Sequence, residues 1–70
     1  MTLRTYSAVI QKVGEWYVAS CPEVGTVSQG HSVEKALANL KEATELHLEE
    51  FPNAVGERPI LTTFEAAIGA

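Results

Sequence analysis

The arrangement of apolar and polar residues in the second half of the chain predicts one long helix. Apolar or small residues recur at intervals of three and four from residue 33 to residue 51, which places them on one side of a helix. The hydroxyl of Ser32 can accept a hydrogen bond from the first free amides, and Pro52 disfavours helical geometry at the residue before it. The apolar stripe consists of Val33, Ala36, Leu37, Leu40, Thr44, Leu48 and Phe51.

Alternation in the first thirty residues predicts three strands. Residues 3–12 alternate between apolar and polar side chains, residues 16–21 are rich in aromatic and β-branched residues, and residues 26–29 form a shorter run. Gly14 and Gly25 separate these runs, and a glycine can adopt the positive φ that lets the chain reverse direction. These signals predict antiparallel strands joined by tight turns.

A fourth strand is predicted over residues 60–65, because ILTTFE combines two threonines with three large apolar residues. Residues 53–59 are predicted to form a loop, since they contain Gly56 and Pro59. The predicted order is β-β-β-α-β, an α+β fold in which one helix packs on an antiparallel sheet. Seventy residues fit one domain, residues 1–70.

A single helix covers only one face of a sheet, so the second face needs an explanation. Depending on register, this face would carry Val9, Tyr17, Ala19 and Cys21. A short chain buries only about 60% of its unfolded surface, and Cys21 is the only cysteine, so no intrachain disulfide stabilises it. We therefore expect these four residues to form an interface in a homo-oligomer, either a dimer or a tetramer. Scattered surface apolar residues, or cover by the C-terminal segment, are the alternatives.

The charge of the chain bears on its partners. Five basic and nine acidic residues give a net charge of −4, which argues against binding to nucleic-acid phosphates and favours a basic protein partner. The chain has no apolar run of the roughly 20 residues that span a membrane, and its N-terminus lacks the apolar core of a signal peptide. We expect a cytoplasmic protein without nucleic-acid or membrane binding.

Four carboxylates are predicted on the side of the helix opposite the apolar stripe. Local stability does not require them, because Glu45 and Glu49 repel each other and Glu49 lies at the negative end of the helix dipole. A solvated helix face and a partner-binding surface both remain open. The candidate partner contacts are Glu34, Glu42, Glu45 and Glu49 on the helix, and Glu23 in the turn after the second strand.

The sequence predicts no catalytic residue, no cofactor and no metal site. Cys21 could act as a nucleophile if a histidine activated it, but it fits better as a small apolar strand residue. His47 falls within the apolar stripe and His31 in a loop, and no zinc-binding spacing is present. The alternative from another functional class is a homo-oligomeric domain that binds a small molecule at a subunit interface near Trp16, Cys21 and His47.

The order of these segments resembles the N-terminal domain of the HicB family, the antitoxin half of HicA/HicB toxin–antitoxin pairs. The resemblance extends over residues 3–51. It consists of an aromatic strand, a Pro-acidic turn, a strand closed by glycine, and a helix with Ala, Asn and Glu at fixed spacing. The residues concerned are Trp16 to Ala19, Pro22, Glu23, Gly30, Ser32, Glu34, Ala36, Asn39, Glu42 and Ala43.

This resemblance implies a partial ribonuclease-H-like fold and a role as an antitoxin that is not an enzyme. In the family, the domain binds HicA, a small basic RNase that cleaves mRNA by means of a histidine, and masks its active surface. Many family members continue into a DNA-binding domain, whereas this chain ends at residue 70. A chain without that domain is not expected to repress its own operon by itself. We therefore expect a short antitoxin that neutralises a HicA-like toxin; a solitary family member with a changed role is the alternative.

Overall fold

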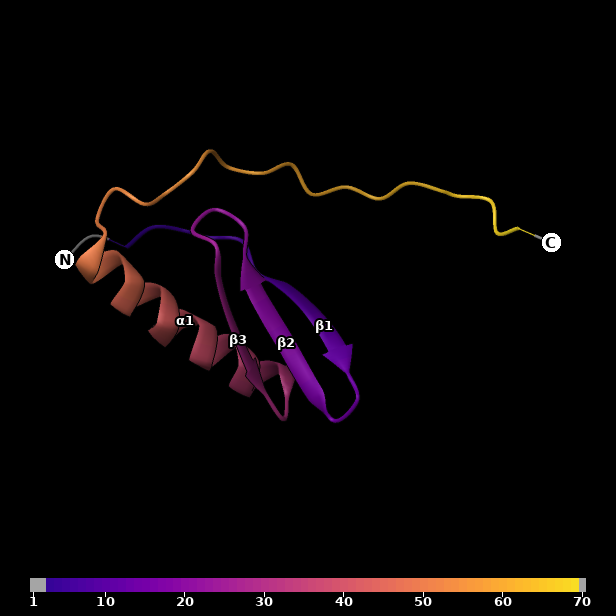
Figure 1. Ribbon diagram of the computed structural model, residues 1–70, viewed down its shortest axis with the longest axis horizontal. Coiled ribbons are helices and arrows are strands. Elements are labelled where there is room, and N and C mark those ends of the chain that lie inside the picture. Colours follow the sequence, from indigo (N-terminus) through magenta and orange to yellow (C-terminus); the bar gives the residue numbers. More distant parts are fainter. Residues whose placement is uncertain (1–2, 70) are drawn as a thin grey trace.

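The protein folds as a three-stranded antiparallel sheet with one helix across one of its faces (Figure 1). The computed structural model describes residues 3–69. The arrangement confirms the predicted α+β class and the β-β-β-α order. Each strand pairs with its neighbour in the chain. The elements are β1 (Val9–Val13), β2 (Trp16–Cys21), β3 (Thr26–Gly30) and α1 (Val33–Glu50).

Two glycine-containing turns connect the strands. Only Gly14 and Glu15 separate β1 from β2, and Gly14 has a φ of +62°, a conformation that favours glycine. Gly25, with a φ of +88°, closes the second turn, and its N–H donates to the carbonyl of Cys21 at 2.7 Å. Both turns were predicted from their glycines.

β1 is shorter than predicted. The sequence predicted a strand over residues 3–12, but pairing with β2 begins only at Val9, opposite Ser20. β2 ends at Cys21 because Pro22 has no N–H to continue the ladder. Residues 3–8, here called the N-terminal arm, consequently have no partner strand.

α1 begins and ends where the sequence predicted. Ser32 has an extended backbone, with φ −144° and ψ 166°, and its side chain accepts a hydrogen bond from the N–H of Lys35. At the other end, the N–H of Phe51 donates to the carbonyl of His47 at 2.9 Å. No helix in the described part of the chain combines the length and apolar character that crossing a membrane requires. The buried residues of α1 come from the predicted stripe and are Ala36, Leu40 and Thr44.

Small residues allow α1 to approach the sheet closely. A Cβ added at Gly30 would lie 2.6 Å from the backbone nitrogen of Ala36 and 2.8 Å from the carbonyl carbon of Lys35. The helix therefore lies over β3 and, to a lesser extent, β2, and leaves the β1 side of the same face open. The buried hydrophobic residues of the core are Ala19, Cys21, Ala36 and Leu40.

The face of the sheet turned away from α1 is uncovered and largely apolar. Of the predicted interface residues only Val9 lies on it. Tyr17, Ala19 and Cys21 face α1, so their assignment to the open face was wrong. Alternation separates the two faces of a strand but does not say which one a helix covers, and the small residues Ala19 and Gly30 decide this. The apolar residues on the open face are Val9, Val13, Trp16, Val18 and Val27.

The predicted strand over residues 60–65 does not form in the chain. The segment after α1 is fixed at two points: the N–H of Gly56 donates to the carbonyl of Glu23 at 2.7 Å, and the guanidinium of Arg58 donates to the carbonyl of Thr5 at 3.1 Å. Residues 59–69, here called the tail, make no backbone hydrogen bond to the sheet and extend past it (Figure 1). A strand needs a partner edge, and the chain places none beside the tail.

Replacing Gly30 with alanine should destabilise the fold. The added methyl group would overlap backbone atoms of α1, so the helix must move away from β3. We expect the free energy of unfolding to fall by about 1–3 kcal/mol, the usual cost of overpacking. Urea denaturation followed by circular dichroism measures this change. Gly69→Ala is the matched control, since its methyl group would meet nothing within 4 Å; equal unfolding free energies for the two variants would contradict the prediction.

Candidate protein-binding groove

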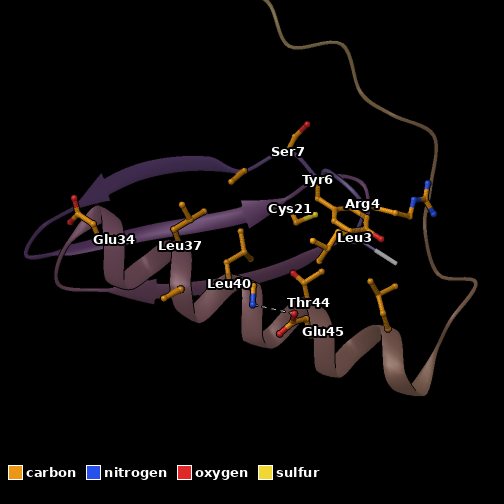
Figure 2. A pocket seen from close by; sticks show the side chains of 14 residues that line it. Leu3, Arg4, Tyr6, Ser7, Cys21, Glu34, Leu37, Leu40, Thr44 and Glu45 are labelled. Atoms are coloured by element: carbon orange, nitrogen blue, oxygen red, sulfur yellow. Dashed lines mark ion pairs between the residues drawn. The ribbon is translucent and has the colours of Figure 1, made fainter. Parts of the chain in front are cut away.

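A groove of about 580 Å³ lies between α1 and the N-terminal arm (Figure 2). It exists because α1 is displaced toward β3, which leaves the β1 side of the helix-covered face without cover. Leu37, Leu40 and Leu48 of α1 form one apolar wall, and Leu3 and Tyr6 of the arm face them. The groove is open to solvent along its length, so a partner could enter it without unfolding the chain.

Two carboxylates stand on the helix side of the groove. Each helical residue advances by about 100° around the axis, so Glu34 and Glu45 lie about 60° from Leu37 and Leu48, toward the solvent side of the groove. Arg4 and Lys41 also line the groove, so its rim carries charges of both signs. Glu45 lies 3.3 Å from the ammonium of Lys41, but both side chains are more than half exposed, so this ion pair contributes little. Apolar walls suit a partner segment with apolar residues, and the carboxylates of Glu34 and Glu45 suit Lys or Arg on that segment.

The structure brings only two of the four predicted helix carboxylates to the groove. Glu42 and Glu49 lie further around α1, are exposed, and do not line the groove. They add negative charge to the same flank of the helix without touching the apolar walls. The predicted acidic surface therefore divides into an inner pair on the rim and an outer pair in solvent.

Glu23, predicted as a partner contact, has a structural position instead. It is 6% exposed, and its carboxylate accepts hydrogen bonds from the N–H of Ser7 at 2.8 Å and from the thiol of Cys21 at 3.6 Å. Burial disfavours the charged form, but these hydrogen bonds outweigh it and hold the pKa of Glu23 below its ordinary value. Glu23 thus fixes the N-terminal arm beside β2 and is withdrawn from the partner-facing surface. A turn carboxylate gives no sequence signal that a distant backbone amide will bind it.

Two side-chain hydrogen bonds between α1 and β3 were not predicted. The hydroxyls of Thr26 and Thr44 lie 2.7 Å apart, and the side-chain amide of Asn39 donates to the carbonyl of Gln29 at 2.8 Å. These bonds hold α1 along β3 and so help to set the width of the groove. The available signal was the presence of Thr44 within an otherwise apolar stripe.

The structure separates the residues that were considered for nucleophilic or ligand-binding chemistry. Trp16 and Cys21 lie at opposite ends of β2 and on opposite faces of the sheet. His31 stacks on Trp16 with ring centroids 4.0 Å apart, and His47 packs against Phe51 at 5.1 Å. Trp16, Cys21 and His47 therefore do not converge on one site within the chain. Over residues 3–69, no group of three His, Cys, Asp or Glu side chains is placed to hold a metal ion.

The chain is similar to a protein of Helicobacter pylori strain J99 that carries the designation UPF0150 protein. The two sequences are 54% identical over 43 residues. The match covers 60% of this chain and 60% of the relative, so it spans less than two thirds of either protein. No model of a protein family matches the chain.

The buried carboxylate of Glu23 should make stability depend on pH in the acid range. Its pKa is lower in the folded than in the unfolded state, so its contribution is present above the unfolded pKa, about 4.3 for glutamate, and is lost as the pH falls through the folded pKa. Glu23→Gln should flatten this acid dependence. Glu42→Gln, which neutralises an exposed helix carboxylate, is the matched control.

Urea unfolding of the three proteins between neutral pH and about pH 3 measures the effect. If the free energies of unfolding of the Glu23→Gln variant and the parent chain changed in parallel with pH, Glu23 would not be the cause of the acid dependence.

Proposed function

We propose that this chain is an antitoxin-like protein-binding module that neutralises a small basic mRNA-cleaving toxin by covering its active surface. The observation that carries the proposal is the groove, with apolar walls and the carboxylates of Glu34 and Glu45 on its rim. An RNase uses Lys and Arg to hold the RNA backbone, and the same side chains are complementary to the carboxylates of Glu34 and Glu45. The inhibitor would then compete with RNA for one surface.

A resemblance and the charge of the chain support a toxin of the HicA class as the partner. The order of strands, turn and helix over residues 3–51 resembles the HicB antitoxin domain. The net charge of −4 favours association with a basic partner on electrostatic grounds.

The proposed action is binding without catalysis. The thiol of Cys21 is 2% exposed and is hydrogen-bonded to the carboxylate of Glu23, an arrangement that favours a structural thiol over a nucleophile. The imidazole of His31 is stacked on Trp16, and that of His47 packs at a tilt against Phe51. These positions support an inhibitor that works by masking its partner.

A second candidate function is the binding of a small apolar molecule in the groove. Its volume of about 580 Å³ lies within the range of roughly 300–1,000 Å³ typical of ligand sites. Tryptophan fluorescence is a poor probe for such a ligand, because Trp16 lies on the opposite face of the sheet. Chemical-shift changes at Tyr6 and Leu37 would report it directly.

The direct test is a pull-down from a lysate of the source organism, with this chain as bait and mass spectrometry to identify what is retained. We expect a small basic protein whose RNA cleavage stops when an equimolar amount of this chain is added. If folded bait retains no such protein, or if the captured RNase remains active in the complex, the antitoxin proposal fails.

Charge reversal on the groove rim should weaken the complex. Glu34→Lys/Glu45→Lys should raise the Kd by about tenfold or more and reduce its dependence on salt. Glu15→Lys/Glu57→Lys is the matched control, because it makes the same change of charge in the β1–β2 turn and in the segment after α1, away from the groove. Calorimetric titration of each double variant at low and high salt measures the Kd and its salt dependence. Equal Kd values for the two double variants would exclude the rim as the contact.

A further inference from the structure

The tail carries large apolar side chains that touch very little of the chain. Ile60, Phe64 and Ile68 are 90%, 89% and 96% exposed, and Leu61 is 60% exposed. Residues 60–65 are rich in strand-forming side chains, yet they form no strand because no edge lies beside them. Soluble monomers rarely leave so much contiguous apolar surface in water, so the exposed side chains of this segment indicate a site of interaction with a partner.

The area exposed by the single chain also exceeds that of a compact domain. Its accessible surface is 5934 Å², whereas a folded protein of 7.6 kDa should expose about 4,300 Å². The excess is about 1,600 Å² per chain. Two chains that buried this excess against each other would remove about 3,200 Å² in total, which is within the range of obligate homodimers.

β1 offers a free edge to a further strand. The sheet order β1-β2-β3 places β1 at a border, and no described residue pairs with its outer side. The other border is partly occupied, because α1 lies along β3 and Asn39 donates to the carbonyl of Gln29. An unpaired edge strand is a template for another strand, and β1 directly follows Ala8, which lines the groove.

We propose that residues 60–65 of one chain add as a strand to β1 of a second copy, which returns the same contact and so forms a symmetric dimer. The bond from Arg58 to Thr5 fixes the root of the tail, and beyond it the tail runs clear of its own sheet (Figure 1). Its exposed apolar residues are therefore presented outward, where a second chain can meet them.

The alternation of side chains in the added strand fits both faces of the sheet. Ile60 and Phe64 would share one side and lie next to Ile10 on the helix-covered face, where the groove is open. Leu61 would fall on the other side, beside the exposed side chain of Val9. The second copy would thus supply the missing wall of the groove and cover part of the open face.

The test is the molar mass of the full chain and of two double variants, measured by light scattering during size exclusion. We expect the parent chain to have twice the 7.6 kDa of one chain, and Ile60→Asp/Phe64→Asp to have the mass of one chain with an unchanged far-ultraviolet helix signal. Thr63→Asp/Ala67→Asp is the matched control, since it adds the same charge at one position on the other side of the strand and at one position beyond its end, and it should remain a dimer.

Hydrogen exchange provides a second readout, because amides of β1 that β2 leaves free should be protected in the parent chain and unprotected in Ile60→Asp/Phe64→Asp. A parent chain with the mass of a monomer would overturn the proposal. If the β1 amides of that monomer were protected, the tail would pair with its own sheet instead. A dimer that persists in Ile60→Asp/Phe64→Asp would also overturn it. The measurement requires no toxin, because it follows the mass and the amide exchange of this chain alone, so its failure is distinct from a failure of the antitoxin proposal.

Discussion

The close approach of α1 to β3 is the constraint on which the other features depend. At Gly30 the helix backbone occupies the space that a side chain would fill. The contact draws α1 to one side of the sheet, selects the face it covers, and leaves the groove above the β1 side. It also restricts the core to small residues and one leucine, so few large side chains leave water. At about 25 cal/mol per Å² of apolar surface, a lone chain gains little from such a core, and association becomes physically reasonable.

Local signals in the sequence predicted the helix and the turns better than they predicted which face of the sheet is covered and which strands pair. The hydroxyl cap at Ser32, the apolar stripe and the turn glycines depend on residues close in sequence, and the helix and the two turns that rest on them were confirmed. The face assignment failed because alternation alone does not say whether Ala19 and Cys21 lie on the face of the sheet that the helix covers or on the opposite face. The fourth strand failed because propensity describes a segment alone, whereas a strand requires a neighbouring edge.

The groove shows the same division between local and non-local information. Glu34 and Glu45 were predicted on the side of the helix opposite the apolar stripe, but they line the groove together with Leu37 and Leu48 of that stripe. Their position beside an apolar cavity was not predictable, because it depends on where α1 crosses the sheet and on the path of the N-terminal arm. Glu23 was assigned to the partner-binding surface for a related reason: no local pattern shows that its carboxylate accepts a hydrogen bond from an amide 16 residues away in the chain.

The hydrogen bond from Arg58 to Thr5 joins residues 53 positions apart, whereas the sheet pairings link neighbouring segments. A topology of consecutive hairpins has low contact order and folds quickly, but closing the long loop between Thr5 and Arg58 carries a larger entropic cost. We expect this closure to form last and to open first, so the N-terminal arm and the root of the tail would open as one cooperative unit. In amide exchange these two segments would share one opening rate, distinct from that of the hairpins and helix, and the two ends of the chain would gain or lose order together.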